Sequence, residues 1–469
     1  MARSAALVDG SVARHLVAQT LPMVLGIACI MGVGLLDAYF IGRLGPDPLA
    51  AVGFIFPVSV ALSSLGVGVM VGVNSVVSRA LGAAERERAA ARGVQGIALA
   101  GGVGAFVALA LLLGHESLFV ALQAPPDLLP LIGDYIVPYA FGLPLLLLAM
   151  GANGVLRGQG EAVKSSSILV AVALVNGVLD PLLIFGIGPF PALGVSGAGW
   201  ATAIANLAAM VLGLTLASTC ELPLHPRHAL RHDVSGGVRE LGRVGAPAAI
   251  ANAINPIGIS LVTALLARHG QDAVAAYGAA GRLQSVAVVP LLALSSSIGP
   301  ITGQNWGANE PGRARRALGL SGGFSVGYGL LVALALFLLR DPIASLFSDD
   351  ARVVEQLASY LALASWGFFG YGLLIVANGA MNAVDRASLA FGLSVARVAL
   401  LLLPLAWLGT RQGPSFVYGA ELAANLVGGA AAFGAAWWAL GGGFSARARR
   451  AARAPGRRAA RRSSRARSG

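Results

Sequence analysis

Long runs of apolar residues alternate with short polar stretches along the whole chain. Each run reaches the roughly 20 residues that a helix needs to cross a bilayer. Helices are expected because backbone groups in lipid must be paired within their own segment. The runs lie near 17–40, 50–76, 94–114, 134–156, 166–187, 197–218, 244–267, 273–301, 318–339, 357–381, 388–408 and 416–440. The pattern therefore predicts an all-α polytopic membrane protein with twelve transmembrane helices.

The two sets of six runs repeat one another at a constant offset of 225 residues. Pro22 matches Pro247, and Tyr135 matches Tyr360. Because six is even, both halves enter the membrane from the same side, as in secondary transporters built from parallel repeats. A duplicated scaffold that does not move is the alternative. We expect an N-terminal lobe at 1–219, a cytoplasmic linker at 220–243, a C-terminal lobe at 244–440 and a disordered basic tail at 441–469.

Composition supports the membrane interpretation. Of the 469 residues, 56% are hydrophobic and only 12% are charged, with a mean hydropathy of +0.76. Soluble domains carry about 25% charged residues, so a soluble globule is excluded. Six His and two Cys leave little material for a zinc site or a disulfide framework. No phosphate loop or nucleotide fingerprint occurs, so we expect neither an enzyme nor a cofactor.

Positive charge is concentrated at one side of the predicted membrane. The net charge is +12, and ten arginines lie in the tail at 444–469. Such a tail is expected to contact anionic lipid rather than nucleic acid. If the N-terminus is cytoplasmic, the cytoplasmic loops and tails hold 26 of the 33 Lys and Arg, and the outer loops hold five. This ratio predicts that both termini are cytoplasmic.

Two acidic residues interrupt the apolar helices of the N-terminal half. Asp37 lies near the outer end of the first span, and Asp180 lies near the outer end of the fifth. Their repeat partners are the apolar Val262 and Leu405. A carboxyl group within a membrane span costs roughly 2.5–3.5 kcal/mol, so it marks a functional site by default. We predict that the two acids couple transport to an ion.

Other polar residues are predicted to converge on these acids. Asn176 lies one turn before Asp180, on the same face. Tyr135, Tyr139 and Thr202 also fall in the outer half of the N-terminal lobe. This oxygen-rich set can bind a proton or Na⁺. The residues alone do not distinguish the two coupling ions.

The C-terminal half offers fewer candidates. Glu421 is expected to be an interfacial residue, Arg397 to snorkel or pair, and Arg282 to be a cavity residue or an internal anchor. A mid-helix proline, Pro22, supplies a hinge in the first span. Residues expected to line a substrate cleft are Tyr139, Asn153, Asn252, Asn255, Gln284, Asn378 and Asn382.

Several motifs are similar to those of one transporter family. They are DAYFIGRLG from Asp37 to Gly45, NGVLDPLLIFG from Asn176 to Gly186, and GQNWGA from Gly303 to Ala308. Together they resemble the multidrug and toxic compound extrusion (MATE) family over nearly the whole chain except the tail. The resemblance implies two six-helix lobes in a V. It also implies a secondary antiporter in the bacterial inner membrane that exports small organic, often cationic, compounds.

The resemblance is closer to the DinF-like branch than to the NorM-like branch. By motif, it implies that the ion-coupling residues are Asp37, Tyr135, Asn176, Asp180 and Thr202, and that Pro22 bends the first helix. NorM-like members carry acids in spans 7 and 10, where this chain has asparagines. H⁺ is therefore preferred to Na⁺, and no metal site is assigned with confidence; Asp37, Asn176 and Asp180 would be the ligands of Na⁺.

Two alternatives to drug export remain. One is a lipid-linked precursor flippase of the same superfamily. The other is a non-transporting membrane scaffold whose basic tail recruits a partner. We expect a monomer in the bilayer.

Overall fold

The computed structural model describes residues 6–222, 224–225, 227 and 232–441, and the regular elements among them are all helices. The first half, here called the N-lobe, consists of α1 (Val12–Gly42), α2 (Pro46–Gly82), α3 (Arg86–Ala121), the short η1 (Pro126–Leu128), α4 (Leu129–Gln159), α5 (Ala162–Phe185) and α6 (Val195–Ser218).

The second half, the C-lobe, is less regular. It consists of α8 (Val234–Leu266), η2 (Ala267–His269), α9 (Gln271–Gly307), α10 (Pro311–Leu338), α11 (Arg340–Phe347), α12 (Ala351–Leu363), η3 (Ala364–Gly367), α13 (Phe368–Ala383), α14 (Ala387–Ala396), the π-helical turn η4 (Arg397–Leu402), α15 (Leu403–Gly409) and α16 (Pro414–Leu440). Twelve helical stretches of the described chain are long and apolar enough to cross a membrane, which confirms the predicted fold class.

The structure differs from the predicted boundaries in three places. α8 begins at Val234, so the last ten residues of the predicted linker are its first turns. α11 was not predicted, and span 10 is α12 and α13 joined by a 3₁₀ turn. The predicted tail lies outside the described residues, apart from its first residue, Gly441.

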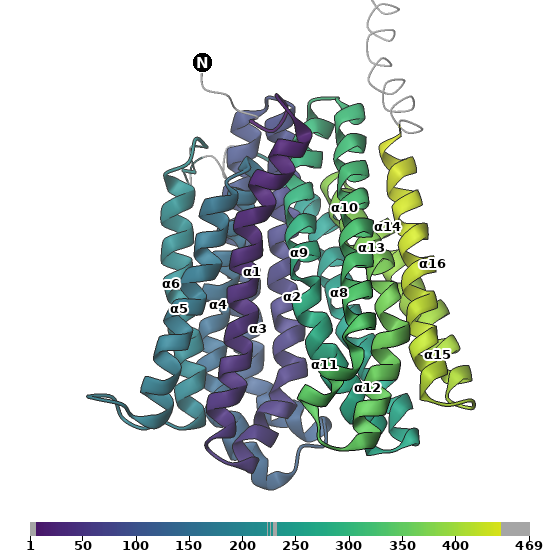
Figure 1. The fold of residues 1–469 in the computed structure, drawn as a ribbon. Coiled ribbons are helices and arrows are strands. Elements are labelled where there is room, and N and C mark those ends of the chain that lie inside the picture. The colour runs from purple at the N-terminus through teal and green to yellow at the C-terminus, as the bar shows by residue number, and fades with distance from the viewer. Residues whose placement is uncertain (1–5, 223, 226, 228–231, 442–469) are drawn as a thin grey trace, which may run out of the picture.

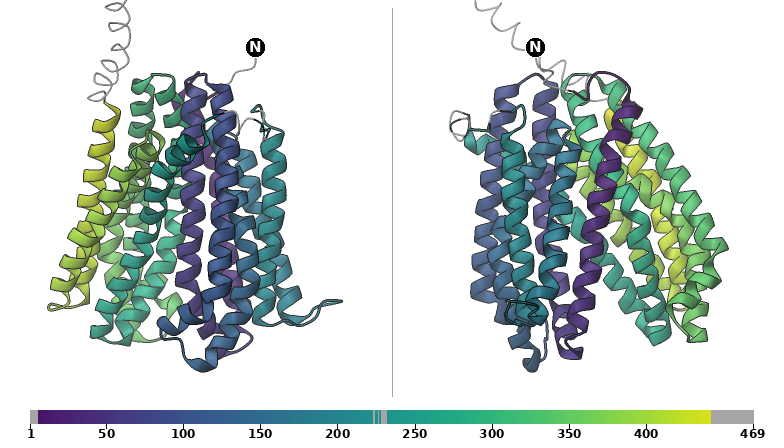
Figure 2. Two further views of the ribbon diagram at one scale, coloured as in Figure 1. Left: turned by 180° about the vertical axis from the view of Figure 1, so that it is seen from behind. Right: turned by 60° about the vertical axis from the view of Figure 1, so that its left-hand side comes forward.

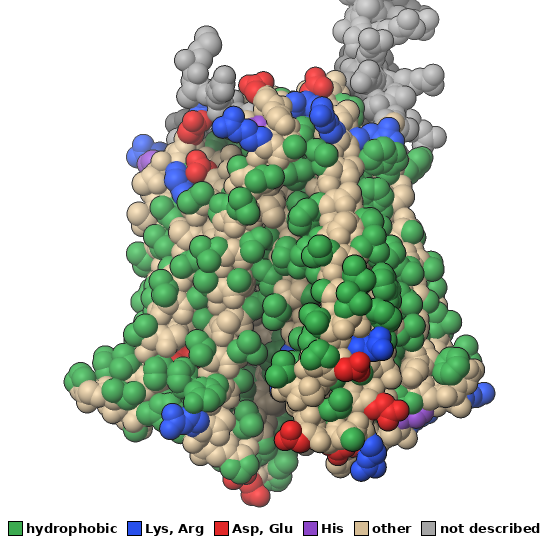
Figure 3. Space-filling view, in the orientation of Figure 1, with side chains coloured by type: hydrophobic (Ala, Val, Ile, Leu, Met, Phe, Trp, Pro, Cys, Tyr) green, Lys and Arg blue, Asp and Glu red, His purple; other side chains and the backbone are tan. Residues whose placement is uncertain are grey.

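The two lobes pack together at one end and diverge at the other (Figures 1 and 2). We call the end where α1 begins and α16 finishes the closed end, and the opposite end the open end. In the space-filling view the surface is hollowed between the lobes in its lower half, towards the open end (Figure 3). Green apolar side chains dominate the middle of this face, whereas charged side chains gather at the two ends.

Small residues allow the lobes to approach closely at the closed end. A Cβ on Gly72 of α2 would lie 2.8 Å from the carbonyl oxygen of Leu241 in α8, and one on Gly68 would lie 2.5 Å from that of Gly245. Gly82 meets the backbone of Gln304 in α9 in the same way. Larger side chains at these positions would hold the lobes apart, because backbone atoms already occupy the space.

Charged side chains also join the lobes at this end. Glu240 of α8 pairs with Arg88 at 3.0 Å and with Arg92 at 3.1 Å, both on α3, and its carboxylate lies 3.9 Å from Arg79 of α2. Arg79 in turn donates to the carbonyl oxygen of Ala383 at 3.0 Å. The sequence analysis did not anticipate this network.

Candidate functional site

Asp37 and Asp180 meet inside the N-lobe, at the contact between α1 and α5. Their carboxyl groups lie within hydrogen-bond reach of each other. Asn176 donates its side-chain amide to Asp180 Oδ1 at 3.2 Å. The other oxygen of Asp180, Oδ2, and Asp37 Oδ1 are both buried without a hydrogen-bond partner. The centre of the site is therefore a carboxyl pair with two unused oxygens.

Two tyrosines and a threonine lie beside the carboxyl pair. The rings of Tyr135 and Tyr139 in α4 stack with their centroids 5.8 Å apart. The Tyr135 hydroxyl lies near Thr202 in α6, whose own hydroxyl donates to the Ala198 carbonyl oxygen at 3.0 Å. Gly199 makes this possible, since a Cβ there would lie 2.7 Å from the Tyr135 carbonyl oxygen. The close approach of α4 and α6 thus depends on a residue without a side chain.

The five residues predicted to couple the ion come together from four helices. Asp37 lies on α1, Tyr135 on α4, Asn176 and Asp180 on α5, and Thr202 on α6. All belong to the half of the N-lobe near the open end, because α1 and α5 run towards that end and carry their acids late in the helix. Among the described residues, no three His, Cys, Asp or Glu side chains gather closely enough to hold a metal ion.

Pro22 lies within α1, fifteen residues before Asp37, and the helix continues through it. Its carbonyl oxygen accepts a hydrogen bond from the Ser166 hydroxyl of α5. The same two helices therefore carry both the carboxyl pair and the contact at the proline, so a bend at Pro22 would move Asp37 relative to Asp180.

A second buried polar cluster, which the sequence analysis missed, lies in the C-lobe. The expectation that Glu421 is interfacial was wrong, since its side chain is 5% exposed. It accepts hydrogen bonds from Tyr360 at 3.1 Å, from Tyr277 at 3.3 Å and from Gln284 at 3.5 Å. Tyr360 is the repeat partner of Tyr135, and this constant offset was the one signal that pointed to the cluster.

Arg397 lies near Glu421 and donates to two asparagines, while its Nε is buried without a partner. Its guanidinium donates to Asn425 at 2.6 Å and to Asn255 at 2.7 Å, and it lies over the ring of Tyr371. Asn255 and Gln284, both predicted to line a cleft, are thus engaged in the C-lobe cluster.

The remaining predicted cleft residues lie in three different settings. Asn153 does not line the cleft, because it is 1% exposed and bonded to Arg157 and Ser165 in the N-lobe. Asn252 of α8 donates to Ser64 of α2 at 3.1 Å, across the lobe contact.

The last two lie on α13. The amide of Asn378 donates to the Ser394 hydroxyl at 3.0 Å. Asn382 lies at the closed end, where its backbone carbonyl oxygen accepts from the Ser75 hydroxyl of α2, and its side-chain oxygen is buried without a partner. Asn382 therefore belongs to the lobe contact rather than to an open cleft.

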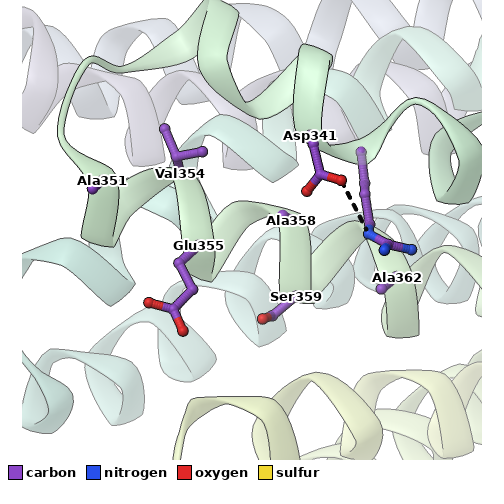
Figure 4. A pocket seen from close by; sticks show the side chains of 8 residues that line it. Asp341, Ala351, Val354, Glu355, Ala358, Ser359 and Ala362 are labelled. Atoms are coloured by element: carbon purple, nitrogen blue, oxygen red, sulfur yellow. Dashed lines mark ion pairs between the residues drawn. The ribbon is translucent and has the colours of Figure 1, made fainter.

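A surface pocket lies apart from these residues, between α11 and α12 (Figure 4). Its wall includes Glu355, Ser359 and the ion pair of Arg340 with Asp341 at 3.7 Å. None of the predicted site residues lines it, so it adds nothing to the carboxyl pair.

Comparison with known proteins gives a consistent result. A model of the MatE family matches residues 22–182 and 247–408, two segments that begin 225 residues apart. An FAD transporter of Shewanella oneidensis is 37% identical over 413 residues, which cover 86% of this chain and 89% of that protein. A probable multidrug resistance protein, NorM, of Pseudomonas syringae is 28% identical over 385 residues, 79% of this chain and 82% of that one.

The chain also resembles solved structures. The Vibrio cholerae MATE transporter VcmN in its bent form matches with a TM-score of 0.84 and 28% identity, over 92% of this chain and 97% of that one.

Proposed function

The chain belongs to the MatE family of membrane transporters, and from this premise we propose that it exports amphipathic organic compounds, often cationic, in exchange for protons. It is a multi-pass membrane protein and not an enzyme. The observation that carries the proposal is the contact between Asp37 and Asp180, where one buried oxygen of each carboxyl group has no partner.

A proton held between these two groups explains their contact. Two ionised carboxylates repel each other, and a single shared proton relieves the repulsion. Asp37 Oδ1 and Asp180 Oδ2 are the oxygens available for it. Na⁺ is the alternative ion, with Asp37, Asn176 and Asp180 as ligands. We favour H⁺ because one proton is enough to bridge two neighbouring carboxyl groups, and because spans 7 and 10 carry asparagines in place of acids.

Proton binding would act on the lobes through α1 and α5. Losing or gaining a proton changes the charge on a buried pair, and the pair joins the two helices that also meet at Pro22 and Ser166. The arginine distribution supports a cytoplasmic closed end, and in that orientation the state described here opens outward. Export then requires the closed-end contacts of Glu240 and Gly82 to break in the opposite state.

A flavin nucleotide is the second candidate substrate. The relative with 37% identity over most of both chains is named as an FAD transporter, whereas the relative named for drug resistance is 28% identical. Both candidate substrates are amphipathic aromatic compounds, so the same cleft can bind either.

Efflux from cells tests the proposal. A bacterial strain without its own efflux pumps would express the protein, and accumulation of ethidium and release of FAD would be followed. We expect lower ethidium accumulation or higher external FAD, and loss of the effect in Asp180→Asn. Asp134→Asn removes an exposed acid of α4 near the same end and should have no effect. Cells that handle both compounds like the empty vector would overturn the proposal.

A further inference from the structure

Arg282 occupies an unusual place for an arginine. It lies eleven residues into α9, a helix long and apolar enough to span the membrane, and it is exposed. It makes no ion pair or hydrogen bond with any other described residue. A cation in a membrane span is costly and is normally found facing protein or a water-filled cavity. The direction in which Arg282 faces therefore matters.

The face of α9 that carries Arg282 is the face that packs on the N-lobe. Ala293, which lies three helical turns further along and so on the same side, packs against Met23 of α1 in one buried cluster. Gly307, seven turns from Arg282, approaches the backbone of Arg79 in α2. Towards the open end this face loses its cover, and its members Ala275, Gly278, Arg282 and Ser285 are all exposed.

The part of α1 in the N-lobe that faces α9 is also exposed at the depth of Arg282. Met23 of α1 and Ala293 of α9 mark the contact between the two helices. Gly34 on α1 and Arg282 on α9 each lie eleven residues from this contact, towards the open end. Gly34 is exposed, and no atom lies within 4 Å of the position that its Cβ would take. The same is true of Gly278 beside Arg282. Arg282 thus extends into the cleft between the lobes, about 16 Å from the contact at a rise of 1.5 Å per residue.

The chemistry of the cleft is therefore different on its two walls. Asp37 lies less than one turn beyond Gly34, so the carboxyl pair is buried inside the N-lobe at about this depth, whereas the C-lobe wall bears a guanidinium exposed to the cleft. A guanidinium is planar and binds phosphate or carboxylate with two parallel hydrogen bonds. A purely cationic compound would gain nothing from it.

We propose that Arg282 is the anion-recognising residue of the cleft and that the substrates of this protein carry a phosphate group on an apolar or aromatic body. Phosphate is chosen over carboxylate because the relative with 37% identity is named as an FAD transporter. This inference rests on the proposed transport function and, of its two candidate substrate classes, selects the flavin nucleotides over the cationic compounds. The phosphate has two possible sources, a soluble nucleotide or a phospholipid headgroup, which share the same chemistry at Arg282.

Binding of flavins tests the inference without any ion gradient. Riboflavin and FMN differ by one phosphate, so they form a matched pair of fluorescent probes. The full chain, purified in neutral detergent without added lipid, would be titrated with each probe by fluorescence anisotropy. We expect the wild-type protein to bind FMN at least tenfold more tightly than riboflavin. Arg282→Gln should weaken FMN binding at least tenfold and leave riboflavin binding unchanged.

Two further variants separate recognition from folding. Arg282→Lys keeps the charge but not the fork geometry, and should recover part of the FMN affinity. Arg268→Gln removes an exposed arginine from the open end of the same lobe and should leave FMN binding unaltered. Equal FMN affinity in wild type and Arg282→Gln, an equal loss for riboflavin, or no FMN binding by the wild type would each overturn the inference.

The source of the phosphate and the transport function are tested separately. Displacement of FMN by phosphatidylglycerol in micelles would assign the site to lipid phosphate, and displacement by FAD but not by the lipid would assign it to nucleotides. FMN binding that depends on Arg282, in a protein that shows no gradient-driven flux, would refute the proposed function and leave the role of Arg282 intact.

Discussion

Replacing Glu240 by Gln should shift the protein towards conformations in which the two lobes separate at the closed end. Glu240 lies in the C-lobe, and the arginines that it meets, Arg79, Arg88 and Arg92, lie in the N-lobe. All three contacts must break when the lobes separate here. Glutamine keeps the shape of the side chain and removes its charge, so the packing of the α2–α8 contact is preserved.

The size of the effect follows from distance and exposure. The Glu240 side chain is 24% exposed, with two pairs at 3.0 and 3.1 Å and a third at 3.9 Å. Pairs open to solvent contribute about 0.2–1 kcal/mol each, so the network contributes about 1–2 kcal/mol. Since 1.4 kcal/mol is a factor of ten in an equilibrium constant, we expect a shift of about 5- to 30-fold.

Pulsed electron spin resonance measures this shift directly. Spin labels on Ser218→Cys and Gly312→Cys, both exposed at the closed end, would report the distance between the lobes after Cys29 and Cys220 are replaced by Ser. The population at longer distance should rise in Glu240→Gln. Glu87→Gln removes an exposed acid from α3 at the same end and should leave the distribution unchanged. Identical distributions in wild type and Glu240→Gln would refute the idea that these pairs hold the closed end together.

Three further predictions follow from the same structure. Asp37→Asn and Asp180→Asn should each abolish gradient-driven flux. Thermal stability should stay near that of wild type, because an amide can still bond to the neighbouring carboxyl group. Normal flux in either variant would remove that residue from the coupling site. Asn153→Ala should destabilise the N-lobe by about 2 kcal/mol, since it removes three buried hydrogen bonds to Arg157 and Ser165. Asn378→Ala, which loses one hydrogen bond, should cost less in the same thermal unfolding assay. Gly82→Leu should prevent closure at the closed end and eliminate flux, because its side chain would meet the Gln304 backbone; spin-label distances equal to those of wild type would contradict this.

The helices and the carboxyl pair could be predicted from the sequence because their signals are local or repeated. A run of apolar residues determines whether a span exists, and twelve were found. Asp37 and Asp180 were distinguished by their apolar repeat partners, and one helical turn linked Asn176 to Asp180. These inferences required no knowledge of how distant helices pack.

The contacts between distant helices could not be predicted in the same way. Glu240 pairs with arginines about 150 residues earlier in the chain, and in the sequence those arginines looked like ordinary cytoplasmic charges. Glu421 was misplaced because its burial comes from Tyr277 and Tyr360, which lie on other helices far away in the sequence. Asn153 looked like a cleft residue, yet only the packing around Arg157 shows that its amide is fully used.

Proton movement in proteoliposomes tests the central claim most directly. Purified protein would be reconstituted with a pH-sensitive dye in the lumen, and ethidium or FAD would be added in the presence and absence of Na⁺. The account predicts that substrate flux drives proton movement in the opposite direction without Na⁺, and that Asp37→Asn and Asp180→Asn abolish this movement while Asp134→Asn does not. Substrate flux that requires Na⁺ and moves no protons, or proton-coupled flux that survives in both variants, would contradict it.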